Sequence, residues 1–247
     1  MKSEQLSQFE RDLEELSITL SSKQIDQFLK YYEMLVEKNK VMNLTAITEF
    51  DEVLKKHFID SLSLVKVCDL EKVVSMIDIG TGAGFPGIPL KIAFPNLNVT
   101  LLDSLQKRVV FLQEVIEELA LCDVEAIHGR AEDFAKPNQL REKFDLCVSR
   151  AVENLSTLLE YCLPYVKVGG KFTSYKSEKV SMDSGENKTE MERAEHAITV
   201  LGGKIVEQKS FFLPSSDISR TFIVIEKCRP TPKEYPRKAG TASKKPL

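Results

Sequence analysis

The sequence predicts an α/β fold: a doubly wound, mostly parallel seven-stranded sheet of the Rossmann-like class, preceded by a helical cap. From residue 73 onward, apolar runs alternate with helix-like segments. Short apolar runs of this kind are typical of buried parallel strands. Four glycines, at positions 80, 82, 84 and 87, follow the first run. Glycine allows a positive φ and a close ligand approach, so this strand end is the predicted binding site.

Residues 1–70 are predicted to form the helical cap. Apolar residues recur there at helical spacing in two stretches. Ser21 or Ser22 precedes the second stretch and can cap its helix. The recurring residues are Leu6, Phe9, Leu13 and Leu16 in the first stretch, and Ile25, Phe28, Leu29, Tyr32, Leu35 and Val36 in the second.

A polar break at residues 43–47 separates these helices from a third one. The third helix carries Val53, Leu54, His57, Phe58 and Leu62. His57 and Asp60 lie at i and i+3, so they share one face of it. Two interpretations stay open: the two residues cap and pair locally, or they form a substrate-side wall of an active cleft.

The glycine loop follows the first strand, in the segment VVSMIDIGTGAGFPGIP. A dinucleotide fingerprint would place its third glycine at position 85, which is Phe85, and no Gly-Lys-Ser/Thr of a phosphate loop follows. An acid, Asp78, then G-x-G-x-G, is the usual first motif of class I S-adenosylmethionine-dependent methyltransferases. The loop therefore predicts S-adenosylmethionine as cofactor, with Gly80, Gly82 and Phe85 at its site. The alternative is a tight turn that binds nothing.

The second apolar run, NVTLLD, ends at Asp103 about twenty residues beyond the loop. An acid there usually accepts the ribose hydroxyls of a bound nucleoside. Asp103 alone does not choose between S-adenosylmethionine and NAD. A second role stays open, in which Asp103 or Ser104 caps the helix that begins at Gln106.

Two further strands bring polar residues to the same edge. The third run ends in glycine and is followed by Ala131 and Glu132. An ionised carboxylate accepts hydrogen bonds and suits the amino group of adenine. The fourth run ends at Arg150. Arg150 is interpreted as functional, with an ion pair at the sheet edge as the alternative.

The remaining strands complete the domain predicted for residues 71–227. Gly169-Gly170 marks the expected turn before the fifth strand, and Gly202-Gly203 the turn before the sixth. The last two strands are predicted at residues 204–213 and 221–227. They are expected to pair as an antiparallel hairpin at the edge of the sheet.

Composition narrows the class of protein. The chain has a net charge of −3, no run of 18 apolar residues and an acidic start without a signal sequence, so a cytoplasmic protein without membrane contact is expected. Five cysteines without C-x-x-C spacing predict free, buried thiols. The three histidines are scattered, and no metal site is expected.

Residues 228–247 read as a basic, proline-rich tail. From Lys227 onward there are seven Lys and Arg and one Glu, a local charge of +6, so the rest of the chain carries about −9. The tail lacks apolar periodicity and cannot form a core alone. Its charge suits phosphate contacts, which would make any RNA site local. A solvated terminus without a role is the alternative.

Several motifs together resemble one family. They are Asn43-Leu44-Thr45-Ala46-Ile47, His57-Phe58-x-Asp60-Ser61-Leu62, residues 78–89, Gly129-Arg130-Ala131-Glu132, Ser149-Arg150-Ala151 and residues 235–240. From about residue 25 to the C-terminus, the chain resembles the bacterial small-subunit ribosomal RNA guanine-N7 methyltransferases, also called glucose-inhibited division protein B.

The resemblance implies methylation of N7 of one guanine in 16S ribosomal RNA of the small ribosomal subunit. It also implies that the cofactor contacts the Gly80 loop and Phe85, then Asp103, Ser104 and Leu105, the Ala131-Glu132 pair, and Arg150. Guanine N7 carries no proton, so no catalytic base is expected. A monomer is expected. Two alternatives remain: a methyltransferase for a small molecule or a protein, and a non-catalytic ribosome-binding or assembly module.

Overall fold

The computed structural model describes residues 2–150, 153–177 and 190–247. Its sheet has seven strands in the order β3-β2-β1-β4-β5-β7-β6. The strands β1 to β5 run parallel, and β7 pairs antiparallel with both β5 and β6. Their bounds are β1 Ser75–Ile79, β2 Asn98–Asp103, β3 Val124–His128, β4 Phe144–Arg150, β5 Val166–Ser177, β6 Gly203–Phe212 and β7 Ser219–Lys227. The predicted doubly wound sheet is confirmed.

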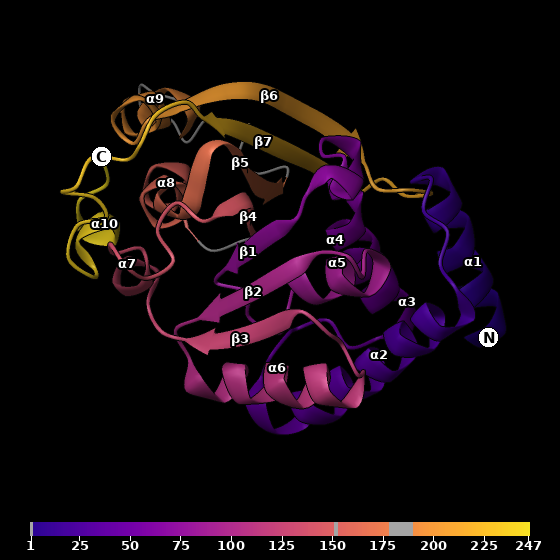
Figure 1. The fold of residues 1–247 in the computed structure, drawn as a ribbon. Helices are drawn as coiled ribbons and strands as arrows, with labels where there is room; N and C mark the ends of the chain where they lie inside the picture. The colour runs from indigo at the N-terminus through magenta and orange to yellow at the C-terminus, as the bar shows by residue number, and fades with distance from the viewer. Residues whose placement is uncertain (1, 151–152, 178–189) are drawn as a thin grey trace.

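Helices cover both faces of the sheet (Figure 1). Alternate residues of β1 point to opposite faces, so Met76 joins one apolar cluster and Ile77 the other. On one face, α5 Gly87–Ala93 and α6 Gln106–Glu118 pack against the sheet; α2 Ser22–Met42 packs on these two helices, and α1 Lys2–Glu15 joins the same apolar cluster. On the other face, α8 Leu155–Cys162 and α9 Glu190–Val200 pack against the sheet. Shorter helices are α3 Phe50–Val53, the π-helix η1 Leu54–Ile59, α4 Asp60–Leu62, η2 Ser63–Lys66, η3 Leu70–Lys72, α7 Ala131–Phe134, η4 Leu163–Tyr165 and α10 Thr241–Lys244.

The N-terminal helices share a core with the sheet. Ser21 caps α2 and accepts the amide of Gln24, whose side chain returns to the Ser21 amide, forming a capping box. The rings of Phe9, Phe28 and Phe58 pack at centroid separations of 5.0–6.4 Å. The third predicted helix is present as α3, η1 and α4, which follow one another without a break.

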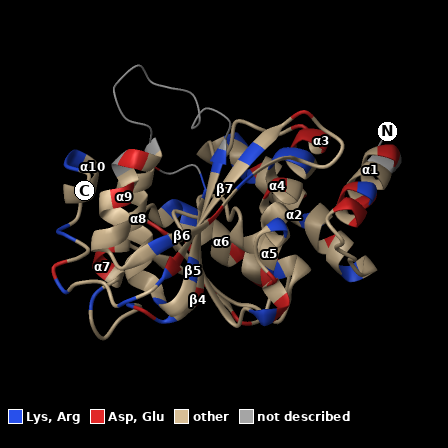
Figure 2. Cartoon of the chain, turned by 90° about the horizontal axis from the view of Figure 1, so that it is seen from above, with Lys and Arg blue, Asp and Glu red and all other residues tan. Residues whose placement is uncertain are grey.

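The C-terminal segment folds back onto the body (Figure 2), where Lys and Arg recur along it beside α7 and α10. Arg237 forms a bidentate pair with Glu160 of α8, whose side chain is 1% exposed. Ala242 is buried, and its carbonyl accepts the Thr157 hydroxyl at 3.2 Å. A basic segment without apolar periodicity does not predict docking, and here single apolar residues, Tyr235 and Leu247, pack against the body beside the polar contacts.

Two smaller expectations were wrong. Gly169 and Gly170 lie inside β5, where its register against β4 shifts, rather than in a turn before it. Of the five thiols, all free, Cys147 and Cys162 are buried as expected, but Cys122 and Cys228 are exposed.

The motif residue Ala151 lies outside the described residues. No helix among those described is long and apolar enough to cross a membrane.

Candidate active site

A buried carboxylate fastens the two ends of the glycine loop. The Oδ2 atom of Asp78 accepts the Thr81 hydroxyl at 2.7 Å and the Gly87 amide at 2.9 Å. Burial raises the pKa of Asp78 to about 6, although these two hydrogen bonds act in the opposite direction. Asp78, the acid of the motif, therefore stabilises the conformation of the loop from its buried side.

The loop glycines differ in what surrounds them. A Cβ at Gly84 would lie 2.7 Å from the hydroxyl oxygen of Tyr31, and one at Gly87 would lie 2.3 Å from Leu101. Both positions therefore require glycine for packing. Gly82 has φ +63°, and the nearest atom to its Cβ position is the Gly80 oxygen, at 4.0 Å. Open space at Gly82 is what a ligand-facing glycine requires.

Asp103 links the end of β2 to the same loop. Its carboxylate accepts the amides of Gly82 and Leu105, each at 2.9 Å. The predicted capping role for Asp103 or Ser104 is wrong, because Leu105 occupies the N-cap position of α6 without any side-chain cap. Asp103 instead lies beside the open space at Gly82.

Two adjoining cavities flank the loop, of about 380 Å³ and about 260 Å³. Gly80 and Ser104 line both of them. Of the other predicted site residues, the larger cavity is lined by Gly82, Phe85, Asp103 and Arg150, and the smaller one by Ala131 and Glu132. Leu105 lines neither; its side chain is exposed. One elongated ligand could span both cavities past Gly80.

The smaller cavity borders the C-terminal segment. Glu132 is buried there, and its Oε1 atom accepts the Gly240 amide at 2.8 Å. The Tyr165 hydroxyl donates to the Ala131 carbonyl at 2.6 Å. The C-terminal segment therefore helps to orient an acid of the cavity wall.

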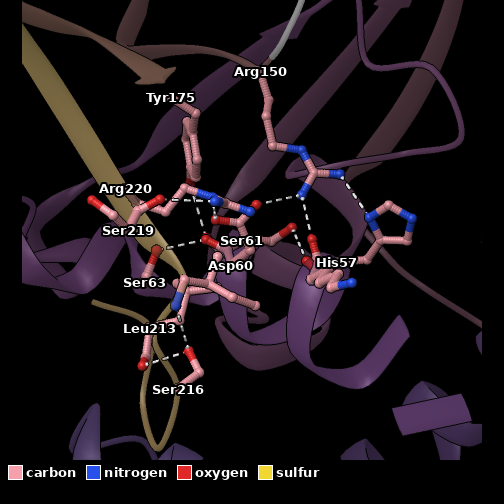
Figure 3. A network of polar contacts seen from close by, with 12 residues as sticks. His57, Asp60, Ser61, Ser63, Arg150, Tyr175, Leu213, Ser216, Ser219 and Arg220 are labelled. Atoms are coloured by element: carbon pink, nitrogen blue, oxygen red, sulfur yellow. Dashed lines mark hydrogen bonds and ion pairs between the residues drawn. The ribbon is translucent and has the colours of Figure 1, made fainter. Parts of the chain in front are cut away.

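Arg150 crosses from the end of β4 to the helical cap (Figure 3). It donates to Asp60 Oδ2 at 2.9 Å, and Arg220 of β7 donates to Asp60 Oδ1 at 2.8 Å. The Arg150 guanidinium also lies 5.1 Å from the centroid of the Phe85 ring. The alternative ion pair is therefore present at Arg150, which also lines the larger cavity, and its functional role stays a prediction.

His57 contributes the cap side of the larger cavity and packs directly on the glycine loop. Its ring stacks on Phe85 with centroids 4.4 Å apart and an interplanar angle of 16°. Nδ1 lies 3.3 Å from an Arg150 nitrogen, and Nε2 lies 2.8 Å from the Thr45 hydroxyl oxygen. Burial, assisted by the charge of Arg150, lowers the pKa of His57 to about 3, so the ring is neutral. His57 thus forms part of a cavity wall, as the second interpretation expects. Asp60 lines neither cavity and pairs with Arg150 and Arg220 instead.

Some residues that line the cavities were not predicted as site residues. Thr45 and Arg108 line the larger cavity, and Tyr161 lines the smaller one. Tyr31 of α2 is fully buried and donates to the Ala83 carbonyl at 2.5 Å, which ties the cap to the glycine loop. Its position three residues after Phe28 and four before Leu35 signalled burial, but nothing signalled its partner.

Comparison with known proteins identifies the family. Residues 24–211 match the family described as rRNA small subunit methyltransferase G, or GidB. The chain belongs to this family. It is 52% identical over 241 residues, 98% of this chain and 97% of its counterpart, to the ribosomal RNA small subunit methyltransferase G of Lachnoclostridium phytofermentans. The same protein of Alkaliphilus metalliredigens is 53% identical, with 95% of each chain covered. The family predicted from the motifs is confirmed.

Solved structures support the fold independently. An S-adenosylmethionine-dependent methyltransferase from Aquifex aeolicus superposes with a TM-score of 0.53 at 16% identity, covering 78% of this chain and 98% of that one. The mitomycin 7-O-methyltransferase MmcR gives a TM-score of 0.52 at 14% identity, covering 68% and 52%. At such identities the likeness concerns the fold alone, and the predicted class I methyltransferase fold is confirmed. In this chain, the helical cap adds Thr45 and His57 to the lining of the larger cavity.

Proposed function

We propose that this chain transfers a methyl group from S-adenosylmethionine to N7 of one guanine in 16S ribosomal RNA of the small ribosomal subunit. The observation that carries the proposal is the pair of cavities that meet at Gly80 and Ser104, in a chain of the rRNA small subunit methyltransferase G family. The smaller cavity would hold the adenine, and the larger one, partly walled by Leu44, Thr45 and His57 of the cap, would hold the rest of the cofactor.

The donors and acceptors fit S-adenosylmethionine. Glu132, beside Ala131, would accept the adenine amino group in the smaller cavity. Asp103 would accept the ribose hydroxyls next to Ser104, and the Leu105 amide keeps that carboxylate in place. The other proposed contacts are Gly80, Gly82, Phe85 and Arg150, which line the larger cavity on the methyl side.

The reaction needs orientation more than acid–base chemistry. The cofactor supplies a methyl group on a positively charged sulfur, and the N7 lone pair forms the new bond as the carbon–sulfur bond breaks. One positive charge moves from sulfur to the guanine ring, and no proton is transferred. A neutral His57 suits that shift because it adds no positive charge beside the ring that becomes cationic. Asp60 offsets part of the Arg150 charge, although it also pairs with Arg220. We therefore assign no catalytic base. Holding the reactants in line can lower a barrier by roughly 7–11 kcal/mol.

We propose three parts for the chain: the cap of residues 1–70 facing the RNA, the methyltransferase domain of residues 71–227, and the basic tail of residues 228–247. The aromatic contacts and Tyr31 hold the cap against the loop. The protein is proposed to act as a cytoplasmic monomer without metal or membrane. In support, the exposed large apolar residues of the described chain come from different elements, for example Val41 of α2, Val168 of β5 and Phe212 of β6.

A methyl-transfer assay with tritiated S-adenosylmethionine tests the function. Naked 16S RNA, assembled 30S subunits and total protein are offered separately. Label in either RNA form supports the proposal, and label in protein alone contradicts it. Calorimetry on the same preparation compares S-adenosylmethionine with NAD. Binding of NAD without binding of S-adenosylmethionine would overturn the cofactor assignment.

A further inference from the structure

The hydroxyl of Thr45 lies where the helical cap meets the larger cavity. Thr45 follows the left-handed Asn43 that ends α2, and its amide donates to Asn39 at 2.8 Å. The residue is partly exposed and lines the cavity together with His57 and Phe85. Its side chain is therefore fixed on one side and faces the cavity on the other.

The direction of the hydrogen bonds around Thr45 follows from Arg150. A guanidinium can only donate, so Nδ1 of the neutral His57 ring accepts from Arg150. The proton of the ring is then on Nε2, which donates to the Thr45 oxygen at 2.8 Å. The Lys56 carbonyl also lies near the ring, but it accepts from Arg150 at 3.3 Å. The Ile47 amide donates to the same Thr45 oxygen at 3.0 Å.

The Thr45 hydroxyl is left with one outward-facing proton. A hydroxyl oxygen has two lone pairs, and His57 and Ile47 occupy both. Within the part of the chain that the structure describes, the Thr45 hydroxyl makes no hydrogen bond beyond these two. Thr45 is thus a donor of fixed polarity at the wall of the cavity.

We propose that the Thr45 hydroxyl donates to O6 of the target guanine and is a specificity-determining residue of the site. The proposal rests on the proposed function, since it names the base atom that the same site recognises. Guanine presents N7 and O6 as adjacent acceptors on one edge. A donor at O6 leaves N7 free to attack the methyl carbon.

The same donor rejects adenine. Adenine offers N7 but carries an amino group in place of O6, so two donors would face each other. Arg150 sets this polarity, because a guanidinium donates and does not accept, and it thereby sets the tautomer of His57. The cofactor carboxylate is a less suitable partner for Thr45, since the partly exposed Arg108 guanidinium lines the same cavity and suits a carboxylate better, although it also contacts Asp103 at 3.4 Å.

The test combines protein and base variants. Methyl transfer is measured for wild type, Thr45→Val, Thr45→Ser and the control Thr48→Val, which lies outside the cavity lining. The RNA carries either guanine or 2-aminopurine, which keeps N7 but lacks O6, at the methylated position. Calorimetry follows S-adenosylmethionine affinity in each variant and shows that each protein is folded.

For the guanine RNA, we expect Thr45→Val to raise KM about tenfold with little change in kcat, the size expected for one lost hydrogen bond. Thr45→Ser and Thr48→Val should behave as wild type. The preference of wild type for guanine over 2-aminopurine should disappear in Thr45→Val. An unchanged preference in Thr45→Val, beside active wild type, would overturn the inference and leave the proposed function standing. A loss of S-adenosylmethionine affinity in Thr45→Val would also overturn it, since it would place the hydroxyl against the cofactor.

Discussion

Gly82 and Gly84 lie two residues apart in one loop, yet their substitution should fail for different reasons. Gly82→Val places a side chain in the cavity, so S-adenosylmethionine binding should be lost, while the left-handed backbone costs about 1–2 kcal/mol of stability. Gly84→Ala should instead destabilise the fold, since its Cβ meets Tyr31 and Ile88 at 2.7 Å. Calorimetry and denaturant unfolding separate the two effects.

Gly169→Val is the matched control for Gly82→Val. Gly169 has φ +86° and nothing within 4 Å of its Cβ position, and it lies outside both cavities. It should carry a similar backbone cost and bind the cofactor normally. Full cofactor affinity in Gly82→Val would show that the open space at Gly82 is not a binding site.

His57 should make the fold sensitive to acid. Its pKa is about 3 in the folded chain and 6.5 in its ordinary range, so between these values the unfolded chain binds the additional proton. Stability should therefore fall as the pH drops from 6.5 toward 3, by up to about 1.4 kcal/mol per pH unit. Asp78, whose pKa rises to about 6, has the opposite sign, so stability from that group is lost as the pH rises through 6.

The contribution of His57 is isolated by comparing wild type with His57→Asn. Urea unfolding at pH 7.5 and pH 5.0 gives the free energy of unfolding of each. We expect wild type to lose more stability than the variant on acidification. An equal loss in both would mean that the His57 ring is not held neutral by its surroundings.

At the scale of elements, Asp60 holds β4, β7 and the cap together. It is 3% exposed and pairs with Arg150 and Arg220. Asp60→Asn removes the negative charge from between two guanidiniums, which should cost about 3 kcal/mol of stability. Urea unfolding measures this loss, and Glu118→Gln is the control, because its pair with Lys30 is half-exposed and should contribute nothing measurable. Equal effects of the two variants would contradict the role given to Asp60.

At this scale, the sequence predicts those features that are determined by residues close together in the chain. The strand ends and the glycine loop were predictable, because apolar runs and glycine spacing act within a few residues. The partner of Arg150 was not, since Asp60 lies 90 positions away along the chain. The misplaced turn at Gly169-Gly170 has a similar origin: glycines mark a special backbone but do not distinguish a turn from a register shift inside a strand.

At the scale of the whole molecule, the C-terminal segment has a structural role beside its charge. Removal of residues 228–247 takes away Arg237 and leaves Glu160 as a buried, unpaired carboxylate. We expect the truncated chain to lose melting temperature and, through the lost Gly240 contact to Glu132, cofactor affinity as well. Thermal unfolding and calorimetry test this, and an unchanged melting temperature would contradict the docking.

The predicted RNA contacts of that segment need a variant that preserves the docking. Lys233, Lys238, Lys244 and Lys245 are exposed. Their joint replacement by Gln should leave the melting temperature unchanged and reduce the salt dependence of RNA binding, by roughly 0.7 in slope per lost contact on single strands. An unchanged slope would remove the RNA role and leave the structural one.

The central claim is methyl transfer to guanine N7, and a chemical cleavage tests it most directly. Methylation at N7 makes the guanine ring cationic, so borohydride reduces it and aniline then breaks the chain at that nucleotide. RNA methylated by the protein with labelled S-adenosylmethionine is treated in this way and resolved by length. We expect cleavage at one guanine of 16S RNA, matching the position of the label. Labelled RNA that resists cleavage would place the methyl group elsewhere and contradict the account.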